Sequence, residues 1–154
     1  MTTKAKGMTL EDKINKVNLG YRKKNQALIV KKSTPLKVTS RGISYQTSTV
    51  DYSGIYQKEK IGVAIAFDAK ECANSTSFPL TNIESHQILF LEFFQRLGGD
   101  AFILLNLTKT NKYYKIPISF IIDFKAKNTR KSIPFEDLKN EWLVEIEDYL
   151  KLDK

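Results

Sequence analysis

The sequence predicts an α/β domain in which helices flank a mixed central sheet. Two apolar runs, residues 61–67 and 101–107, are typical of strands whose two faces are both buried. Segments with apolar residues at helical spacing stand before the first run, between the two runs and at the end of the chain. A helix, several strands, a second helix, further strands and a last helix therefore follow one another, an order typical of α/β domains.

The first helix is predicted to begin at Thr9. The Thr9 hydroxyl can cap the first turn, and Asp12 stands three residues later, as in a capping box. From there, apolar side chains at helical spacing mark the buried stripe: Leu10, Ile14, Val17 and Tyr21. Residues 1–7 are basic, and we expect them to be a flexible tail.

A short strand and a projecting arm are predicted next. Residues 27–30 are apolar, and Pro35 ends regular strand pairing soon after them. Residues 36–47 are polar and β-prone with a turn at Gly42, so we expect a short hairpin or stalk. Gly54 is expected to interrupt the backbone before the strand at residues 61–67.

The second helix has a start signal and a stop signal. Thr81 and Glu84 form a capping box, and the helix is predicted to run to about Arg96. Gly98 follows, as glycine often does at a helix C-terminus. The apolar side chains near helical register are Ile83, Ile88, Leu91, Phe94 and Leu97.

The last third of the chain is predicted to contain a hairpin and two helical segments. Residues 101–107 and 112–116 form the hairpin. Residues 118–124 form a short helix or an irregular packed segment, and residues 125–131 a basic loop. A final helix is predicted to start at residues 132–134, because apolar side chains then stand four apart: Leu138, Trp142, Ile146 and Leu150.

Composition narrows the classes of function. A chain of 154 residues is expected to form one domain, and its net charge of +8 indicates a polyanionic partner, although a merely soluble basic protein fits as well. Cys72 is the single cysteine and there is one histidine, so an internal disulfide and a structural zinc set are excluded and any metal must be held by oxygen. No signal-peptide or membrane-spanning apolar run is present, which predicts a cytoplasmic protein.

The candidate catalytic residues are two aspartates and a lysine. Asp51 follows a short β-prone segment, and the apolar run at residues 61–67 ends in Asp68-Ala69-Lys70. Alternate residues of a strand share a face, so Asp68 and Lys70 are expected to point the same way. Carboxylates can bind a hard divalent cation, and an ammonium can stabilise charge on a phosphate. Taken alone, Asp-x-Lys is also common on solvated strands. Glu11, in the first turn of the first helix, can equally be a surface acid.

Basic residues stand at three places where a polyanion could bind. Lys31 and Lys32 follow the first strand, where they can hold a phosphate or simply aid solubility. The arm carries Lys37, Arg41 and Tyr45, which suit contact with a groove or a strand of nucleic acid. The third place is the end of the basic loop, at Arg130 and Lys131.

His86 and Gln87 stand near the start of the second helix. A lone histidine is more often a structural hydrogen-bonding residue than a catalyst. If Gln87 faces the charged end of the sheet, its amide can bind the scissile phosphate or a water on the metal.

Taken together, these segments resemble the RecU family of Holliday junction resolvases of Gram-positive bacteria and their phages. The matching motifs span most of the chain in this order: Gly7-Met8-x-Leu10-Glu11 with Ile14-Asn15-x-x-Asn18 and Tyr21, Lys31-Lys32-x-Thr34-Pro35, Ser48-Thr49-x-Asp51-Tyr52-x-Gly54, Phe67-Asp68-Ala69-Lys70-Glu71, Ser77-Phe78-Pro79-Leu80-x-Asn82, His86-Gln87, Gly98-Gly99 and Arg130-Lys131-Ser132-Ile133. Each motif is short. Their shared order makes the resemblance specific.

The resemblance implies a restriction-endonuclease-like (PD-(D/E)xK) core and a homodimer that nicks four-way DNA junctions at symmetric points with Mg²⁺, for which Mn²⁺ can substitute. It implies that Asp51 and Asp68 are metal ligands and that Glu11 is a further acid near the metal. Lys70 would orient the attacking water or stabilise the transition state. Thr49 and Gln87 would lie beside the site.

The chain departs from the family pattern at three points. Asp68 stands where the family usually has Glu, which shortens the reach of the carboxylate. The spacing from Asp51 to Asp68 is longer, which suggests an enlarged turn at residues 57–60. The arm is shorter than the family's stalk, as in phage-encoded members.

Two rival readings stay open beside the resolvase. The shortened arm leaves room for a less selective nuclease that acts on flaps, forks or ordinary duplex. Asp68 leaves room for a protein that binds branched DNA without cutting it. A role at a membrane surface is disfavoured, because no basic amphipathic helix is visible.

Overall fold

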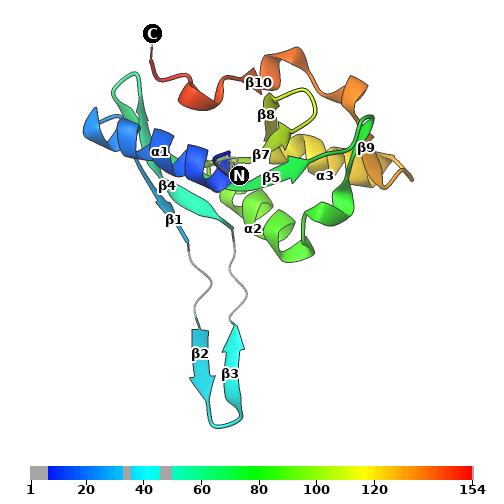
Figure 1. Cartoon of the computed structure of the whole chain (residues 1–154), viewed down its shortest axis with the longest axis horizontal. Coiled ribbons are helices and arrows are strands. Elements are labelled where there is room, and N and C mark those ends of the chain that lie inside the picture. Colours follow the sequence, from blue (N-terminus) through cyan, green and yellow to red (C-terminus); the bar gives the residue numbers. More distant parts are fainter. Residues whose placement is uncertain (1–6, 33–35, 46–49, 154) are drawn as a thin grey trace, which may run out of the picture.

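The computed structural model describes residues 7–32, 36–45 and 50–153, with the backbone alone for residues 36–39 and 43–45. Its centre is a six-stranded sheet in the order β1-β4-β5-β7-β8-β10 (Figure 1). Only β5 and β7 run parallel, and the other neighbours in this sheet are antiparallel, so the predicted mixed sheet is confirmed. The strands are β1 (Ala27–Lys31), β4 (Tyr52–Lys58), β5 (Ile61–Cys72), β7 (Asp100–Leu107), β8 (Lys112–Pro117) and β10 (Leu143–Val144).

Helices cover both faces of this sheet. On one face α1 (Leu10–Lys23) packs its predicted stripe, and Thr9 caps it by accepting a hydrogen bond from the Asp12 backbone N–H. On the other face lie α2 (Ser85–Arg96) and α3 (Ile118–Lys127). Successive residues of β5 point to opposite faces of the sheet. Phe67 packs in the cluster on the α1 side and Ala66 in the cluster on the α2 side.

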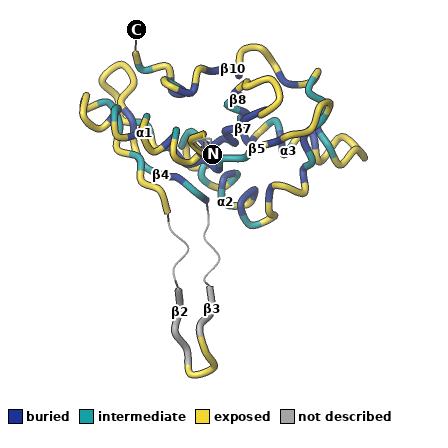
Figure 2. The backbone as a smooth tube through the Cα atoms, viewed as in Figure 1, coloured by how far each residue is buried: buried dark blue, intermediate teal, exposed yellow. Residues whose placement is uncertain are grey.

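The arm extends away from this body (Figure 1). It consists of β2 (Leu36–Thr39) and β3 (Gly42–Tyr45), which pair antiparallel as the predicted hairpin. Its turn at residues 40–42 is exposed, whereas the buried residues concentrate on the central strands (Figure 2). Gly42 has φ of 117°, a conformation that glycine adopts readily. Apart from Gly7, the predicted flexible tail lies outside the described residues.

Two local expectations about the central hairpin are wrong. Gly54 does not interrupt the chain but lies within β4, where a Cβ atom would stand 1.9 Å from the Leu28 carbonyl oxygen of β1. The expected enlarged turn is instead a two-residue turn, because Lys58 pairs with Ile61 and only Glu59 and Lys60 lie between the strands. Nearly all of the residues between Asp51 and Asp68 therefore lie in paired strands.

The second helix starts later than predicted. Residues Leu80–Asn82 form a short 3-10 turn, so Thr81 does not cap α2. The helix begins at Ser85 after Glu84, whose backbone N–H donates to the Gln87 side-chain oxygen at 3.1 Å. His86 lies 3.2 Å from the Glu84 carboxylate, which fits its structural reading.

The predicted final helix is absent, and this prediction is wrong. Residues 132–150 form two short strands and three 3-10 turns instead: β9 (Ser132–Pro134), Phe135–Asp137, Asn140–Trp142, β10 and Ile146–Asp148. The apolar residues spaced four apart serve two different cores, since Leu138 and Trp142 pack on the α2 side and Ile146 and Leu150 on the α1 side. One helix cannot supply both sides, so the segment wraps around the sheet edge at β10.

Candidate active site

Asp51 and Asp68 lie next to each other across the β4–β5 hairpin. Asp51 immediately precedes β4, and Asp68 lies within β5. The backbone N–H of Asp51 donates to Asp68 Oδ1 at 3.0 Å, and the backbone N–H of Ala69 donates to Asp51 Oδ2 at 3.1 Å. The antiparallel register, in which Tyr52 pairs with Phe67, brings the two carboxylates together. This contact agrees with the choice of both aspartates as candidate catalytic residues.

Lys70 completes the cluster. Asp68, Lys70 and Ala66 share the α2 face of β5, and the Lys70 ammonium lies 2.8 Å from Asp68 Oδ2. The Asp68 side chain is fully buried, and that of Lys70 is 20% exposed. The ammonium of Lys70 is therefore the charge partner of the buried Asp68 Oδ2.

The surroundings of Asp51 disfavour the charged form of its carboxylate. Burial and the contact with Asp68 raise the pKa of Asp51 to about 6. A hard divalent cation offsets such repulsion and takes carboxylate oxygens as ligands. The adjacent carboxylates of Asp51 and Asp68 therefore fit a divalent cation.

The structure does not bring Glu11 into this cluster. Glu11, in the first turn of α1, forms an ion pair with Lys31 at the end of β1. Within residues 7–32, 36–45 and 50–153, no set of three acidic, histidine or cysteine side chains is arranged to hold a metal. The negative charges of Glu11 and Asp51 still act on one neighbour, because after burial they raise the pKa of the Tyr52 hydroxyl.

Glu71 is a residue that sequence reasoning overlooked. Its Oε1 accepts a hydrogen bond from the Leu10 backbone N–H at 3.2 Å. The strand that carries Asp68 and Lys70 thereby holds the N-terminus of the helix that carries Glu11. The only signal was the position of Glu71 directly after the Asp-x-Lys motif.

The two lysines at the end of β1 separate to opposite faces of the sheet. Lys31 faces α1, where it pairs with Glu11. Lys32 faces α2, with its ammonium 5.5 Å from the centre of the Phe90 ring, and its backbone N–H donates to the Asp51 carbonyl at 2.7 Å. Of the two lysines, Lys32 therefore lies on the same side of the sheet as Asp51 and Asp68.

The remaining predicted residues are spread more widely. Gln87 is buried in the first turn of α2, the helix on the same side as Asp68, and its side-chain oxygen bonds the Glu84 backbone. Arg41 lies at the exposed turn of the arm. Lys37 and Tyr45 are placed by backbone only, on β2 and β3, and Thr49 lies outside the described residues.

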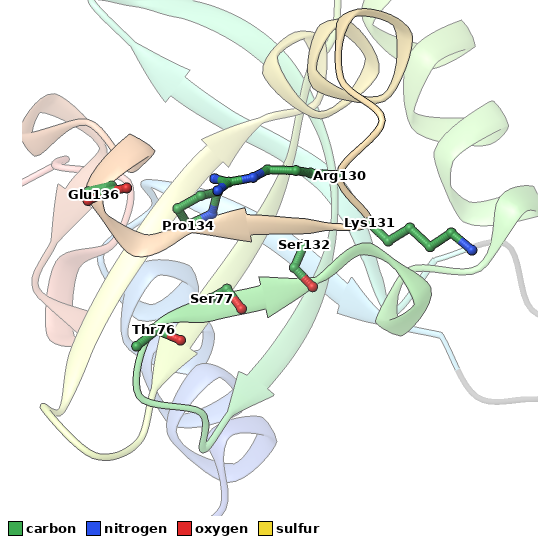
Figure 3. Close-up of a pocket in the computed structure, with 7 residues that line it drawn as sticks. All are labelled: Thr76, Ser77, Arg130, Lys131, Ser132, Pro134 and Glu136. Carbon is green, nitrogen blue, oxygen red and sulfur yellow. The ribbon is translucent and has the colours of Figure 1, made fainter.

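Arg130 and Lys131 are exposed and precede β9, away from the acidic pair along the chain. They line a hollow of about 580 Å³ together with residues from β6 (Ser77–Pro79) and β9 (Figure 3). No helix in the described part of the chain is both long and apolar enough to span a membrane.

Comparison with known proteins gives consistent matches. The model of the family "RecU: Recombination protein U" matches residues 5–153. The Holliday junction resolvase RecU of Oceanobacillus iheyensis is 36% identical over 88% of this chain and 75% of its own length. RecU of a Geobacillus species is also 36% identical, over 87% of this chain and 72% of its own length. Among solved structures, Hjc of Archaeoglobus fulgidus, a Holliday junction resolvase, covers 87% of this chain and 93% of its own at 12% identity, with a TM-score of 0.48.

Proposed function

The chain belongs to the RecU family, as its motifs predict, and from this premise we propose that it is a Holliday junction resolvase, an endonuclease that cuts four-way DNA junctions. The observation that carries the proposal is the contact of Asp51, Asp68 and Lys70 on adjacent strands of a mixed sheet, the restriction-endonuclease-like arrangement that the motifs imply. Residues 1–154 then act as one nuclease domain with a short arm.

Hydrolysis of a phosphodiester joins a water oxygen to phosphorus while the bond to one bridging oxygen breaks. Bound Mg²⁺, or Mn²⁺ in its place, supplies charge neutralisation and activates water. Asp51 and Asp68 hold that ion through carboxylate oxygens. Lys70, held at 2.8 Å from Asp68, places a positive charge where negative charge grows on the phosphate. Glu11 acts as a further acid only if the ion pair with Lys31 opens.

DNA contacts surround this centre on the α2 side and on the arm. Lys32 and Gln87 lie on the same side of the sheet as Asp68. The substrate strand passes between them. Thr49, two residues before Asp51 in the sequence, and Lys31, which faces α1, are further candidate DNA contacts. Arg41 at the turn of the arm, with Lys37 and Tyr45, contacts the junction itself. Such contacts select branched DNA through phosphate placement rather than base identity.

The active form is a homodimer, in which each protomer cuts one of two opposed strands. Apolar side chains are exposed on the α2 side of the molecule, from 48% for Leu28 to 74% for Leu97. By strand register, Leu28, Val30 and Ile55 share a face with Ala66 beside α2. We call this set the apolar face: Leu28, Val30, Ile55, Leu89, Phe93 and Leu97. A second copy can cover it, and two-fold symmetry in the dimer matches that of the junction.

A substrate comparison tests this proposal. An end-labelled four-way junction, a linear duplex and a flap of equal length are incubated with the protein and Mg²⁺ or EDTA. We expect paired nicks at symmetric points in the junction alone, and none with EDTA. Equal cutting of all three substrates would favour a less selective nuclease, and tight junction binding without cutting would leave a DNA-binding protein.

The proposed DNA substrate also fits a protein that acts in the cytoplasm of a bacterium or of a phage-infected host.

A further inference from the structure

A small ribbon beside the main sheet presents a polar outer surface. β6 (Ser77–Pro79) pairs antiparallel with β9. Phe78 and Ile133 face each other on the inner side and are fully buried. Alternation therefore turns the neighbouring residues to the outer side: Ser77, Pro79, Ser132 and Pro134. The buried pair fixes the ribbon, so its outer hydroxyls have defined positions.

Positive charge flanks these hydroxyls. Figure 3 shows Arg130 reaching along β9 toward Pro134, while Lys131 points the opposite way. Among the residues that the structure describes, neither Arg130 nor Lys131 forms a salt bridge. The side-chain hydroxyls of Thr76, Ser77 and Ser132 likewise have no hydrogen-bond partner within those residues. A guanidinium and free hydroxyls are the donors that bind phosphate oxygens.

Two hollows lie beside Arg130 and Lys131, and together they form a surface long enough for more than one phosphate. The first, of about 580 Å³, lies over the ribbon and ends at Glu136. The second, of about 540 Å³, includes Arg130 and Lys131 again, and reaches Lys125 and the start of α2 at Glu84 and Ser85. The surface thus leads from the ribbon to the N-terminus of the helix that carries Gln87.

We propose that the two hollows beside β6 and β9 bind successive backbone phosphates of a duplex arm, with Arg130 as the charged contact over the ribbon, Lys131 as the charged contact at the second hollow, and the hydroxyls of Thr76, Ser77 and Ser132 as neutral donors. The inference rests on the proposed function for the identity of the polyanion. Glu136 opposes a phosphate and limits the site at its far end.

The test uses opposite charge changes in the same hollow. Affinity for a fluorescein-labelled linear duplex is measured by anisotropy in EDTA, so that no cutting occurs, over a range of salt. We expect Arg130→Gln/Lys131→Gln to weaken binding by about 10-fold and to lower the salt slope by about 2, one for each lost phosphate contact. Glu136→Gln should tighten binding by about threefold, since it removes a repulsive charge.

Matched controls lie at the other end of β5. The double variant Lys58→Gln/Lys60→Gln and the single variant Glu59→Gln remove the same numbers of positive and negative charges at the β4–β5 turn, and 11 residue steps of strand separate Ile61 from Cys72, about 36 Å. Both controls should bind duplex like the wild type. Unchanged affinity in Arg130→Gln/Lys131→Gln and in Glu136→Gln would overturn the phosphate site, even if the wild type still nicks junctions. Conversely, the expected affinity changes in a protein that nicks nothing would support the site and remove the proposed function.

Discussion

The two faces of the six-stranded sheet carry different kinds of side chain. On the α1 side, the stacked rings of Tyr52, Phe67 and Phe102 lie 4.7–4.8 Å apart, and buried tyrosine hydroxyls are hydrogen-bonded. On the α2 side, the same strand carries a buried aspartate with an ion pair, and apolar side chains nearby are exposed. Both faces hold a buried apolar core, but the acidic pair with Lys70 and most of the exposed apolar side chains lie on the second face. Because successive residues of β5 alternate between faces, substitutions at neighbouring positions should affect different properties, the free energy of unfolding on one face and the nicking rate on the other.

The largest effect on stability is expected from Phe67→Ala. The ring is fully buried between Tyr52 and Phe102, so truncation should lower the free energy of unfolding by about 4 kcal/mol. Urea unfolding followed by circular dichroism measures it. Ile55→Ala, on the other face and half exposed, should cost about 1 kcal/mol or less. Equal costs for the two variants would contradict the difference in burial between Phe67 and Ile55.

Lys70→Gln should lower the nicking rate far more than an equivalent change at an ion pair away from the acidic cluster. Loss of the ammonium beside Asp68 should lower the single-turnover nicking rate by about 100-fold, because it removes charge stabilisation near the phosphate. Lys115→Gln is the matched control, since Lys115 also lies 2.8 Å from an aspartate, Asp100, with a similar exposed fraction. Nicking by Lys115→Gln should match the wild type. A comparable loss in both variants would mean that Lys70 has only a structural role.

Phe93→Lys should weaken self-association. Phe93 is 58% exposed on α2, within the apolar face, and burying a lysine there should raise the dimer dissociation constant by about 10-fold or more. Sedimentation velocity over a concentration series measures it. Leu19→Lys changes a residue that is 52% exposed on α1, on the opposite side, and should leave association unchanged. Weakening by Leu19→Lys alone would place the interface on the α1 side.

The central features were predictable because local patterns determine them. The apolar run before Asp68 predicts a strand, and strand alternation predicts that Asp68 and Lys70 share a face. The position of Asp51 beside Asp68 follows once the hairpin pairs. The extent of the strand was not predictable: β5 continues beyond the apolar run to Cys72, so Asp68 is buried in mid-strand.

Other features depend on contacts distant in the sequence. The pairing of Glu11 with Lys31 requires α1 to lie over the end of β1, and no local spacing encodes that. The start of α2 was predicted too early, because the Thr81-x-x-Glu84 pattern suggested a threonine cap. In the structure, the Gln87 side chain bonds the Glu84 backbone and the helix starts after Glu84. Residues 135–150 were misread because apolar spacing does not say which of two cores each side chain enters.

The most direct test of the account compares Asp68→Asn with the wild type on an end-labelled four-way junction in Mg²⁺. The amide keeps the size of the side chain but loses the charge that would hold the ion. The account predicts that Asp68→Asn binds the junction at least as tightly as the wild type and produces no paired nicks. Nicking by Asp68→Asn at the wild-type rate would contradict an active site built on Asp51, Asp68 and Lys70.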